Sequence, residues 1–295
     1  MSIKTKIKRL AIIGVGLIGG SFGVSLRYRG AVEEIVGYGR NIKNLGLAKE
    51  LGLIDRWTTN IDEAVSHADI VLIATPVGAM PAVFDLMKDA IAPECIITDV
   101  GSVKQVITEA FKNSFLDQNV HFIPGHPIAG REVSGPAAAD GDLFVGKTVI
   151  LTPEQNTDVD AISRVQELWQ LVGSKVICMS PERHDRLLAL TSHLPHVMAY
   201  TLVNLLKDEE DQQQDTLNFA AGGFYDLSRI ASSDPIMWRD ICLTNNNEIV
   251  SRLESYQNSL SHMIDILEAK DGAALEKLFN RARETRERIK QLNKH

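Results

Sequence analysis

The stretch Leu10-Ala11-Ile12-Ile13-Gly14-Val15-Gly16-Leu17-Ile18-Gly19 is a short apolar run that leads directly into the glycine pattern G-x-G-x-x-G. A helical pattern follows over residues 22–28. The glycines therefore join a buried strand to a helix at the start of a βαβ unit, and this context makes the pattern specific. The stretch predicts an α/β fold with a turn that binds a dinucleotide.

Each glycine has its own task in such a turn. Gly14 permits the sharp bend, Gly16 lets backbone amides approach a pyrophosphate, and Gly19 lets the helix pack closely on the strand. We expect the pyrophosphate at the N-terminus of the helix, beside Leu17 and Ile18. Unsatisfied amides and the helix dipole favour an anion there.

The choice of dinucleotide depends on the residue about 20 positions after the third glycine, where NAD enzymes carry a carboxylate. Here that position is Gly39, followed by Arg40 and Asn41. A carboxylate would repel a 2′-phosphate, whereas a guanidinium binds one through two charge-assisted hydrogen bonds. The sequence therefore predicts NADP as the cofactor, with Arg40 and Asn41 near its 2′-phosphate. A solvated surface role for Arg40 is the alternative.

Further β-rich runs alternate with helical patterns as far as residue 178. They cover residues 34–38, 69–74, 95–98, 121–124, 148–151 and 175–178. Nearly continuous apolar strands of this kind are typical of a mostly parallel sheet that is covered by helices on both faces.

The pattern changes at Ser180-Pro181, a helix start signal, and no strand pattern follows it. Apolar residues recur at spacings of three and four over residues 249–267 and 275–292. The acidic segment 208–215 is interpreted as a solvated loop or a helix start. We predict a Rossmann-type, mostly parallel sheet domain, residues 1–179, followed by an all-α domain, residues 180–295.

The helical domain has more apolar surface than one small bundle hides easily. We therefore expect a homodimer in which these apolar faces meet a second copy across a two-fold axis. A helical subdomain that packs on the sheet of its own chain is the alternative.

Composition excludes several classes of protein. The chain has 295 residues, and its net charge of −7 argues against a nucleic-acid partner. No apolar run approaches the roughly 20 residues that a membrane span needs. Three cysteines that cannot all pair are interpreted as buried free thiols of a cytoplasmic protein without a signal peptide.

Polar residues follow the strands 69–74, 95–98 and 121–124, at the sheet edge where open α/β sheets bind ligands. We expect Thr75, Pro76, Gly101 and Ser102 to line the nicotinamide end of the cofactor. His126 is the candidate general base, because an imidazole titrates near neutrality and can take a hydroxyl proton as hydride leaves the same carbon. The alternative for His126 is a purely structural histidine.

Ser102 has two possible roles. Its hydroxyl can hydrogen-bond the substrate or the nicotinamide, or it can cap a helix that begins at Val103.

Further polar residues lie in the helical half. His193 and His196 are one helical turn apart, but no third ligand has matching spacing, so no metal site is predicted. Arg229 and Arg239 lie in apolar stretches, where charged residues are rarely buried without a partner. Each arginine is predicted either to bind a substrate carboxylate or to pair with one of three aspartates, Asp226, Asp234 and Asp240.

Five motifs occur in one order along the chain. They are GVGLIGGS at 14–21, DVGSVK at 99–104, GHPIAG at 125–130, SHLPH at 192–196 and SDPIMWRD at 233–240. Together they resemble the prephenate/arogenate dehydrogenases of tyrosine biosynthesis.

The resemblance implies a helical dimerisation domain after the Rossmann-type domain, and oxidative decarboxylation of a cyclohexadienol without a metal. It implies that His126 hydrogen-bonds the ring hydroxyl with support from Ser102. The substrate pocket is then expected to contain His193, His196, Arg229 and Trp238, with Arg229 near a substrate carboxylate.

The resemblance implies that relatives acting on arogenate commonly use NADP, so the predicted NADP preference favours arogenate over prephenate. Glu132 or Asp226 is a candidate partner for the arogenate ammonium. The alternatives are a prephenate dehydrogenase that gives 4-hydroxyphenylpyruvate, a β-hydroxyacid-type dehydrogenase, and a non-catalytic dinucleotide-binding module. The β-hydroxyacid type uses a lysine base, which the His126 loop argues against. No chorismate mutase or regulatory domain is expected, and hence no feedback control through one.

Overall fold

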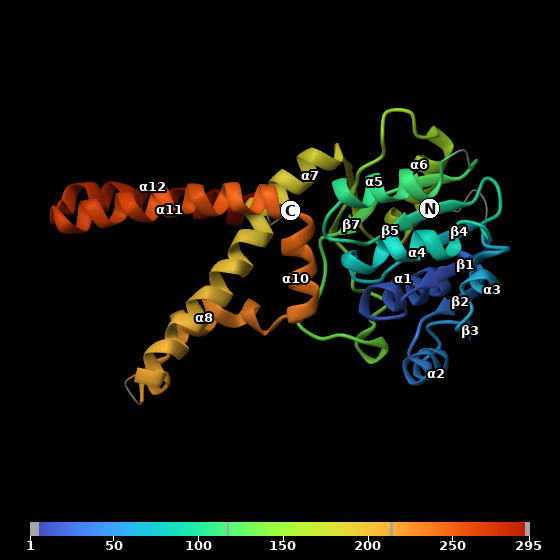
Figure 1. Ribbon diagram of the computed structural model, residues 1–295, viewed down its shortest axis with the longest axis horizontal. Helices are drawn as coiled ribbons and strands as arrows, with labels where there is room; N and C mark the ends of the chain where they lie inside the picture. Colours follow the sequence, from blue (N-terminus) through green and yellow to red (C-terminus); the bar gives the residue numbers. More distant parts are fainter. Residues whose placement is uncertain (1–5, 117, 213–214, 293–295) are drawn as a thin grey trace. The chain divides into compact units, whose positions relative to one another are not determined.

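A six-stranded parallel sheet forms the first layer of the computed structural model, which describes residues 6–116, 118–212 and 215–292 (Figure 1). Its strands lie in the order β3-β2-β1-β4-β5-β6. Their bounds are β1 Ile7–Ile13, β2 Val32–Tyr38, β3 Arg56–Thr58, β4 Ile70–Ile73, β5 Ile96–Asp99 and β6 His121–Ile123. The chain changes direction across the sheet between β1 and β4, and ligands bind at such a switch point.

Both faces of this sheet are buried. Leu10 and Ile12 of β1 belong to one core, and Ala11 and Ile13 belong to the other. The first core packs against α1 (Leu17–Tyr28), α2 (Ile42–Glu50) and α6 (Val159–Leu171). The second packs against α3 (Ile61–Val65), α4 (Met80–Met87) and α5 (Gln105–Ser114). The predicted parallel sheet with helices on both faces is confirmed.

A second sheet of three strands has the order β7-β8-β9. Its strands are β7 Gly125–Pro127, β8 Thr148–Leu151 and β9 Lys175–Cys178. β7 runs antiparallel to β8, with His126 opposite Ile150. Residues 125–127 were expected to be loop, so β7 is a correction. Pairing with β8 makes this segment a strand and fixes the backbone of His126.

The helices after residue 179 begin as the sequence predicts. Ser180 caps α7 (Pro181–Leu188) through a hydrogen bond from the Arg183 amide. A π-helical turn at Ala189–His193 leads into α8 (Leu194–Gln212). Short helices α9 (Gly222–Ser228) and α10 (Pro235–Thr244) follow. The segment 208–212 ends α8 and is not the loop or helix start that was expected, while 213–214 lie outside the described residues.

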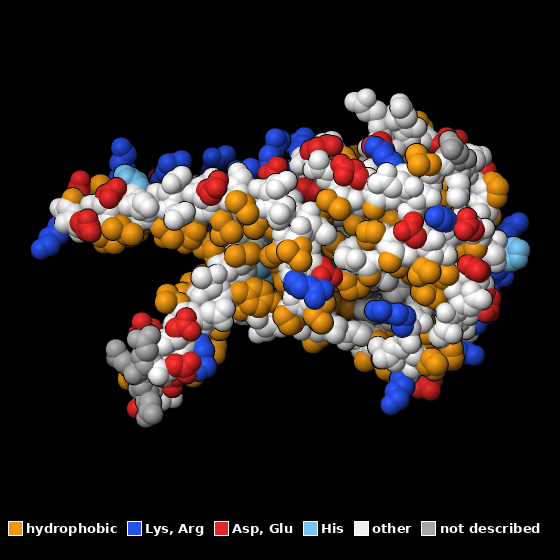
Figure 2. All heavy atoms as spheres, viewed as in Figure 1, with side chains coloured by type: hydrophobic (Ala, Val, Ile, Leu, Met, Phe, Trp, Pro, Cys, Tyr) orange, Lys and Arg blue, Asp and Glu red, His pale blue; other side chains and the backbone are white. Residues whose placement is uncertain are grey.

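By internal contacts the chain divides into residues 1–246 and 247–295. The second unit contains α11 (Asn246–Glu268) and α12 (Gly272–Leu292), which cover the two predicted apolar stripes. Many apolar side chains of these helices are exposed, including Leu260, Ile264, Leu267 and Phe279. Figure 2 shows such hydrophobic side chains along one edge of the α11–α12 region.

The three cysteines are free, but they differ in burial. Cys95 is buried, and burial raises the pKa of its thiol to about 12. Cys178 lies on β9 and is exposed, and Cys242 is half-buried, so the prediction of a buried thiol is wrong for these two residues. Among the described helices, none combines the length and apolar character needed to cross a membrane.

Candidate active site

The three glycines of the turn between β1 and α1 differ in how closely other protein atoms approach them. Gly14 has φ +97°, and a Cβ there would lie 2.7 Å from the Ala74 carbonyl oxygen. A Cβ on Gly19 would lie 2.5 Å from the Gly14 oxygen. Close packing of the protein therefore explains both glycines.

Gly16 is different, because a Cβ there meets no heavy atom within 4 Å. Gly16 precedes α1 without capping it through a side chain, and the first turn of α1 has no acidic residue. The first amides of a helix have no intrahelical partner, and the absence of a side chain at Gly16 leaves the space beside it open. The turn fits the pyrophosphate of a dinucleotide.

The end of β2 presents Gly39 and the exposed side chain of Arg40. Arg40 has no ion pair with any described residue. The side-chain oxygen of Asn41 accepts a hydrogen bond of 3.1 Å from the Asn44 amide and so caps α2. After β4, the Thr75 hydroxyl is buried and has no hydrogen-bond partner in the described part of the chain.

His126 is half-buried and is the first member of a hydrogen-bonded chain that the sequence did not reveal, and the other two members, His184 and Asp185, are buried. Its Nδ1 lies 2.8 Å from Nε2 of His184, and Nδ1 of His184 lies 2.7 Å from Oδ1 of Asp185. The carboxylate can only accept, so His184 Nδ1 carries a proton and His184 Nε2 is an acceptor. His126 Nδ1 therefore donates to His184. The lone pair on Nε2 of His126 is left available, as a general base needs.

The surroundings keep His126 neutral. Burial lowers its pKa well below the ordinary value, and His184, Lys104 and His193 lower it further. Burial also lowers the pKa of His184, although the hydrogen bond to Asp185 opposes this effect. A neutral imidazole with a bare Nε2 is ready to accept a proton at physiological pH.

Asp185 also connects α7 to α5. Its Oδ1 accepts from the Lys104 amide and its Oδ2 from the Gln105 amide, both at 2.9 Å. These amides begin α5, so Asp185 caps this helix. The predicted capping role for Ser102 is wrong, because α5 begins two residues later than expected and Lys104 is at its N-cap. The Ser102 hydroxyl forms no hydrogen bond within the described residues.

His193 lies in the π-helical turn and is fully buried. Its Nδ1 lies 3.1 Å from the Asn245 amide nitrogen, which also donates to the Asp185 carbonyl at 3.1 Å. Burial lowers the pKa of His193 to about 4, with the Ser102 backbone among the groups that oppose this shift. His193 thus contacts the network around His126 and lies beside the Ser102 loop.

His196 stacks on Trp238, with ring centroids 3.7 Å apart and an interplanar angle of 19°. Its Nδ1 donates to the Ser192 carbonyl at 2.9 Å, so a neutral His196 presents Nε2 as an acceptor. Burial lowers the pKa of His196, although the hydrogen bond to the Ser192 carbonyl and the charge of Glu132 oppose this effect. The stacked rings of His196 and Trp238 thus form one surface, on which Nε2 of His196 can accept a hydrogen bond from a ligand.

The two arginines have different partners. Arg239 pairs with Asp240 at 2.6 Å, which is one of the internal ion pairs considered above. Arg229 pairs with Glu132, from the loop between β7 and β8, and with none of the three aspartates. Glu132, a candidate partner for a substrate ammonium, is therefore already paired with Arg229.

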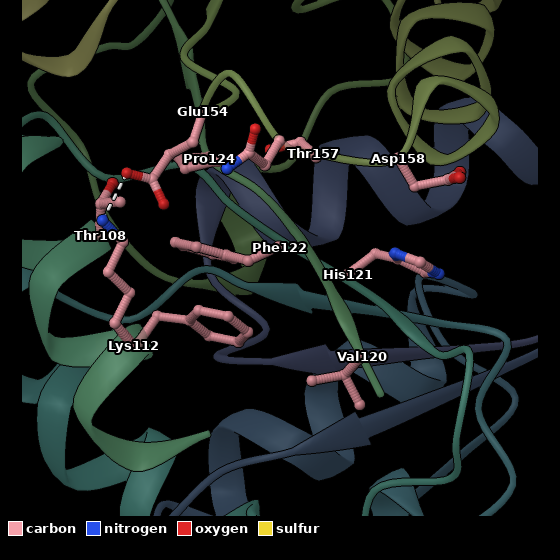
Figure 3. Close-up of a pocket in the computed structure, with 11 residues that line it drawn as sticks. Thr108, Lys112, Val120, His121, Phe122, Pro124, Glu154, Thr157 and Asp158 are labelled. Atoms are coloured by element: carbon pink, nitrogen blue, oxygen red, sulfur yellow. Dashed lines mark ion pairs between the residues drawn. The ribbon is translucent and has the colours of Figure 1, made fainter. Parts of the chain in front are cut away.

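A separate cavity of about 210 Å³ lies between α5, β6 and the loop that follows β8 (Figure 3). Phe111 and Phe122 line it, and an ion pair of 2.5 Å joins Lys112 to Glu154 at its side. None of the predicted site residues lines this cavity. Among the described residues, no group of histidine, cysteine, aspartate and glutamate side chains could hold a metal ion.

A glycine turn at the switch point of a parallel sheet, with a neutral histidine in the same structural unit, is the arrangement expected of a dinucleotide-dependent oxidoreductase. Comparison with known proteins specifies the family. Residues 22–178 match the model for the prephenate dehydrogenase nucleotide-binding domain, and residues 180–281 match the model for the prephenate dehydrogenase dimerization domain. The chain belongs to the prephenate dehydrogenase family, and its cofactor is a nicotinamide dinucleotide.

Individual relatives match over nearly the whole chain. Cyclohexadienyl dehydrogenase of Zymomonas mobilis is 35% identical over 287 residues, which is 97% of each protein. Prephenate dehydrogenase of Bacillus subtilis is 35% identical over 94% of this chain and 75% of its own length.

Comparison with solved structures leads to the same family. Prephenate dehydrogenase from A. aeolicus, in complex with hydroxyphenyl propionate and NAD+, is 35% identical with a TM-score of 0.91. The comparison covers 97% of this chain and 100% of that one. Synechocystis arogenate dehydrogenase is 26% identical with a TM-score of 0.81, over 95% of this chain and 99% of that one.

Proposed function

We propose that the chain catalyses the oxidative decarboxylation of arogenate to tyrosine, with NADP as the hydride acceptor. The observation that carries the proposal is the hydrogen-bonded chain from Asp185 through His184 to His126, in the unit that carries the glycine turn. We assign residues 1–179 to a cofactor domain and 180–295 to a substrate and dimerisation domain. The family matches over 22–178 and 180–281 support this boundary.

The cofactor is assigned to four segments at the carboxyl edge of the parallel sheet, after β1, β2, β4 and β5. They contribute Gly14, Gly16, Leu17, Ile18 and Gly19 at the pyrophosphate, Arg40 and Asn41 at the 2′-phosphate, and Thr75, Pro76, Gly101 and Ser102 near the nicotinamide. Open space at Gly16 and the unpaired Arg40 support this assignment. When bound, the cofactor supplies the hydride acceptor.

His126 acts on the substrate hydroxyl. Its Nε2 takes the hydroxyl proton while the carbon that bears this hydroxyl loses hydride. The ring carboxylate then leaves as CO2, and the electron pair of the broken bond completes the aromatic ring. Nδ1 of His126 already donates to His184, so Asp185 behind His184 stabilises the positive charge that develops on the imidazole.

The side-chain pocket of the substrate is assigned to His193, His196, Arg229 and Trp238. A neutral His196 presents a lone pair on Nε2, which can accept from the ammonium of arogenate. The keto group of prephenate offers no proton there, so His196 and the predicted NADP preference both favour arogenate. Prephenate, giving 4-hydroxyphenylpyruvate, is the alternative substrate, and prephenate dehydrogenases of similar identity support it.

A homodimer is proposed through the helical domain. The exposed apolar side chains of α11 and α12 support it, since a large apolar surface on one chain marks an interaction site. Replacing Leu267 with aspartate is expected to give monomers in sedimentation experiments. An unchanged dimer would place the interface elsewhere.

The test is an assay of four combinations, arogenate or prephenate with NADP+ or NAD+. The proposal expects the highest kcat/KM for arogenate with NADP+, and a selective loss of NADP+ affinity of about 10- to 150-fold for Arg40→Ala. His126→Asn is expected to lower kcat by about 10²- to 10⁴-fold. Preference for prephenate supports the alternative, and turnover of neither compound refutes the function.

A further inference from the structure

Asp99 and Lys104 form a fully buried ion pair beside the loop that carries Ser102 and the strand β7 that carries His126. Both side chains have 0% exposure, and the Lys104 ammonium binds Oδ2 of Asp99 directly. Buried charges are costly, and a buried ion pair contributes little net stability compared with apolar side chains of the same shape. Net stability therefore does not account for this ion pair, whereas its hydrogen bonds to the backbone give it a specific role.

These hydrogen bonds converge on two glycines. Lys104 Nζ donates to the Gly125 carbonyl at 2.7 Å, and Asp99 Oδ1 accepts from the Gly125 amide at 3.1 Å. Asp99 Oδ2 accepts from the Gly101 amide at 2.7 Å. Both backbone groups of Gly125 and the amide of Gly101 are thus held by one ion pair. Gly125 directly precedes His126, and Gly101 directly precedes Ser102.

The same geometry explains why glycine stands at both positions. A Cβ on Gly101 would lie 2.9 Å from Asp99 Oδ2, and a Cβ on Gly125 would lie 3.0 Å from the Asp99 carbonyl oxygen. Neither glycine has a positive φ, so the requirement is one of space and not of backbone conformation. A side chain at Gly101 would collide with the Asp99 carboxylate, and one at Gly125 would push β7 away from the end of β5.

We infer that Asp99 and Lys104 form a positioning clamp that holds the His126 backbone against the Ser102 loop for the reaction proposed above. The clamp touches neither reacting atoms nor substrate, and it acts through the backbone of the two glycines. The clamp also contacts the hydrogen-bonded chain behind His126, because the Lys104 backbone amide donates to the Asp185 carboxylate. Lys104 therefore positions His126 in two ways, through its side chain on Gly125 and through its amide on Asp185.

The variant that tests the clamp is Asp99→Asn combined with Lys104→Met. Replacing Lys104 alone would leave a buried, unpaired carboxylate and destabilise the fold strongly, whereas the double variant keeps the shape and removes both charges. We expect kcat to fall by about 10²-fold, the effect typical of a misplacement of about 1 Å. The KM for substrate and the Kd for the dinucleotide are expected to stay within about threefold of wild type.

A matched control lies on the same helix. Lys112 and Glu154 form an exposed ion pair at 2.5 Å, and Lys112→Met with Glu154→Gln is expected to leave kcat unchanged. Gly125→Ala provides a second test that removes no charge, and the same loss of kcat is expected. If the double variant folds and keeps kcat within threefold of wild type, the clamp is refuted.

Two further measurements distinguish the clamp from a general structural role and from the proposed function. Hydrogen exchange at the Gly101 and Gly125 amides is expected to accelerate in the double variant, whether or not the substrate is correctly assigned. Unchanged protection would refute the clamp even if activity fell. If the wild type oxidises neither substrate, the proposed function fails, and amide exchange in the wild type and both variants still decides the clamp.

Discussion

Replacing His184 with leucine removes the acceptor that fixes the tautomer of His126. In the structure His126 Nδ1 donates to His184 Nε2 at 2.8 Å, and the His184 side chain is fully buried. An unsatisfied buried N–H costs about 1–3 kcal/mol. In the leucine variant this cost raises the free energy of the tautomer that is protonated on Nδ1, which is the tautomer needed for Nε2 to act as the base.

The expected effect follows from this cost. A rise of about 1–3 kcal/mol in the barrier lowers kcat by about 5- to 150-fold. His184→Gln is the matched variant, because its side-chain oxygen can accept from His126 at a similar place, and kcat is expected within about fivefold of wild type. Asp185 Oδ1 keeps its hydrogen bond from the Lys104 amide in both variants, so neither is expected to unfold.

The assay is initial-rate NADPH formation at saturating substrate, with the thermal midpoint of each variant measured alongside. A leucine variant that folds and keeps kcat within twofold of wild type would refute the proposed role of His184. Equal losses in the glutamine and leucine variants would also contradict it, because the acceptor would then not matter.

Three other predictions follow from the geometry. Gly16→Ala is expected to weaken dinucleotide binding at least tenfold in fluorescence titration while leaving the thermal midpoint unchanged, because the new Cβ meets only the ligand; a lower midpoint with normal affinity would contradict this. The pKa of His193 is about 4 in the folded chain, so the unfolded chain binds a proton first as the pH falls. Between about pH 7 and pH 4, the free energy of unfolding of the wild type should therefore drop by about 3 kcal/mol more than that of His193→Gln, as measured by denaturant titration. An equal drop in the two proteins would contradict the lowered pKa of His193. Arg229→Ala should raise the substrate KM at least tenfold, because its guanidinium is assigned to a substrate carboxylate, whereas Arg239→Ala, which removes only the internal ion pair with Asp240, should change it less than twofold; similar KM values for both variants would remove the assigned role of Arg229.

The sequence predicted the long parallel strands because both of their faces are apolar, and this leaves a continuous signal. It did not predict β3 and β7, which are each three residues long. β7 consists of Gly125, His126 and Pro127, residues that are poor strand formers by themselves. Its pairing with β8 depends on a partner more than 20 residues away, and a local pattern does not contain that information.

The candidate base was found from its position after a strand, but its partners were not. The signal for them lies in α7, where Pro181, His184, Asp185 and Leu188 are all buried. Their spacing is that of one helix face, so two polar residues occupy positions that normally carry core side chains. A histidine and an aspartate there indicate a hydrogen-bonded network, although the sequence does not show which loop they meet.

Lys104 and Asp99 belong to the motif DVGSVK at 99–104, but no role was predicted for either side chain. Only the fold brings Gly125 to the motif, since 21 residues separate Lys104 from Gly125.

The protonation state of His126 can be measured directly by nitrogen-15 NMR of the histidine rings at about pH 7.5, with His126→Asn used to assign its signals. We predict a neutral ring with the proton on Nδ1 and a bare Nε2. A proton on Nε2, or a doubly protonated ring, would contradict the proposed mechanism, because His126 could not then accept the hydroxyl proton.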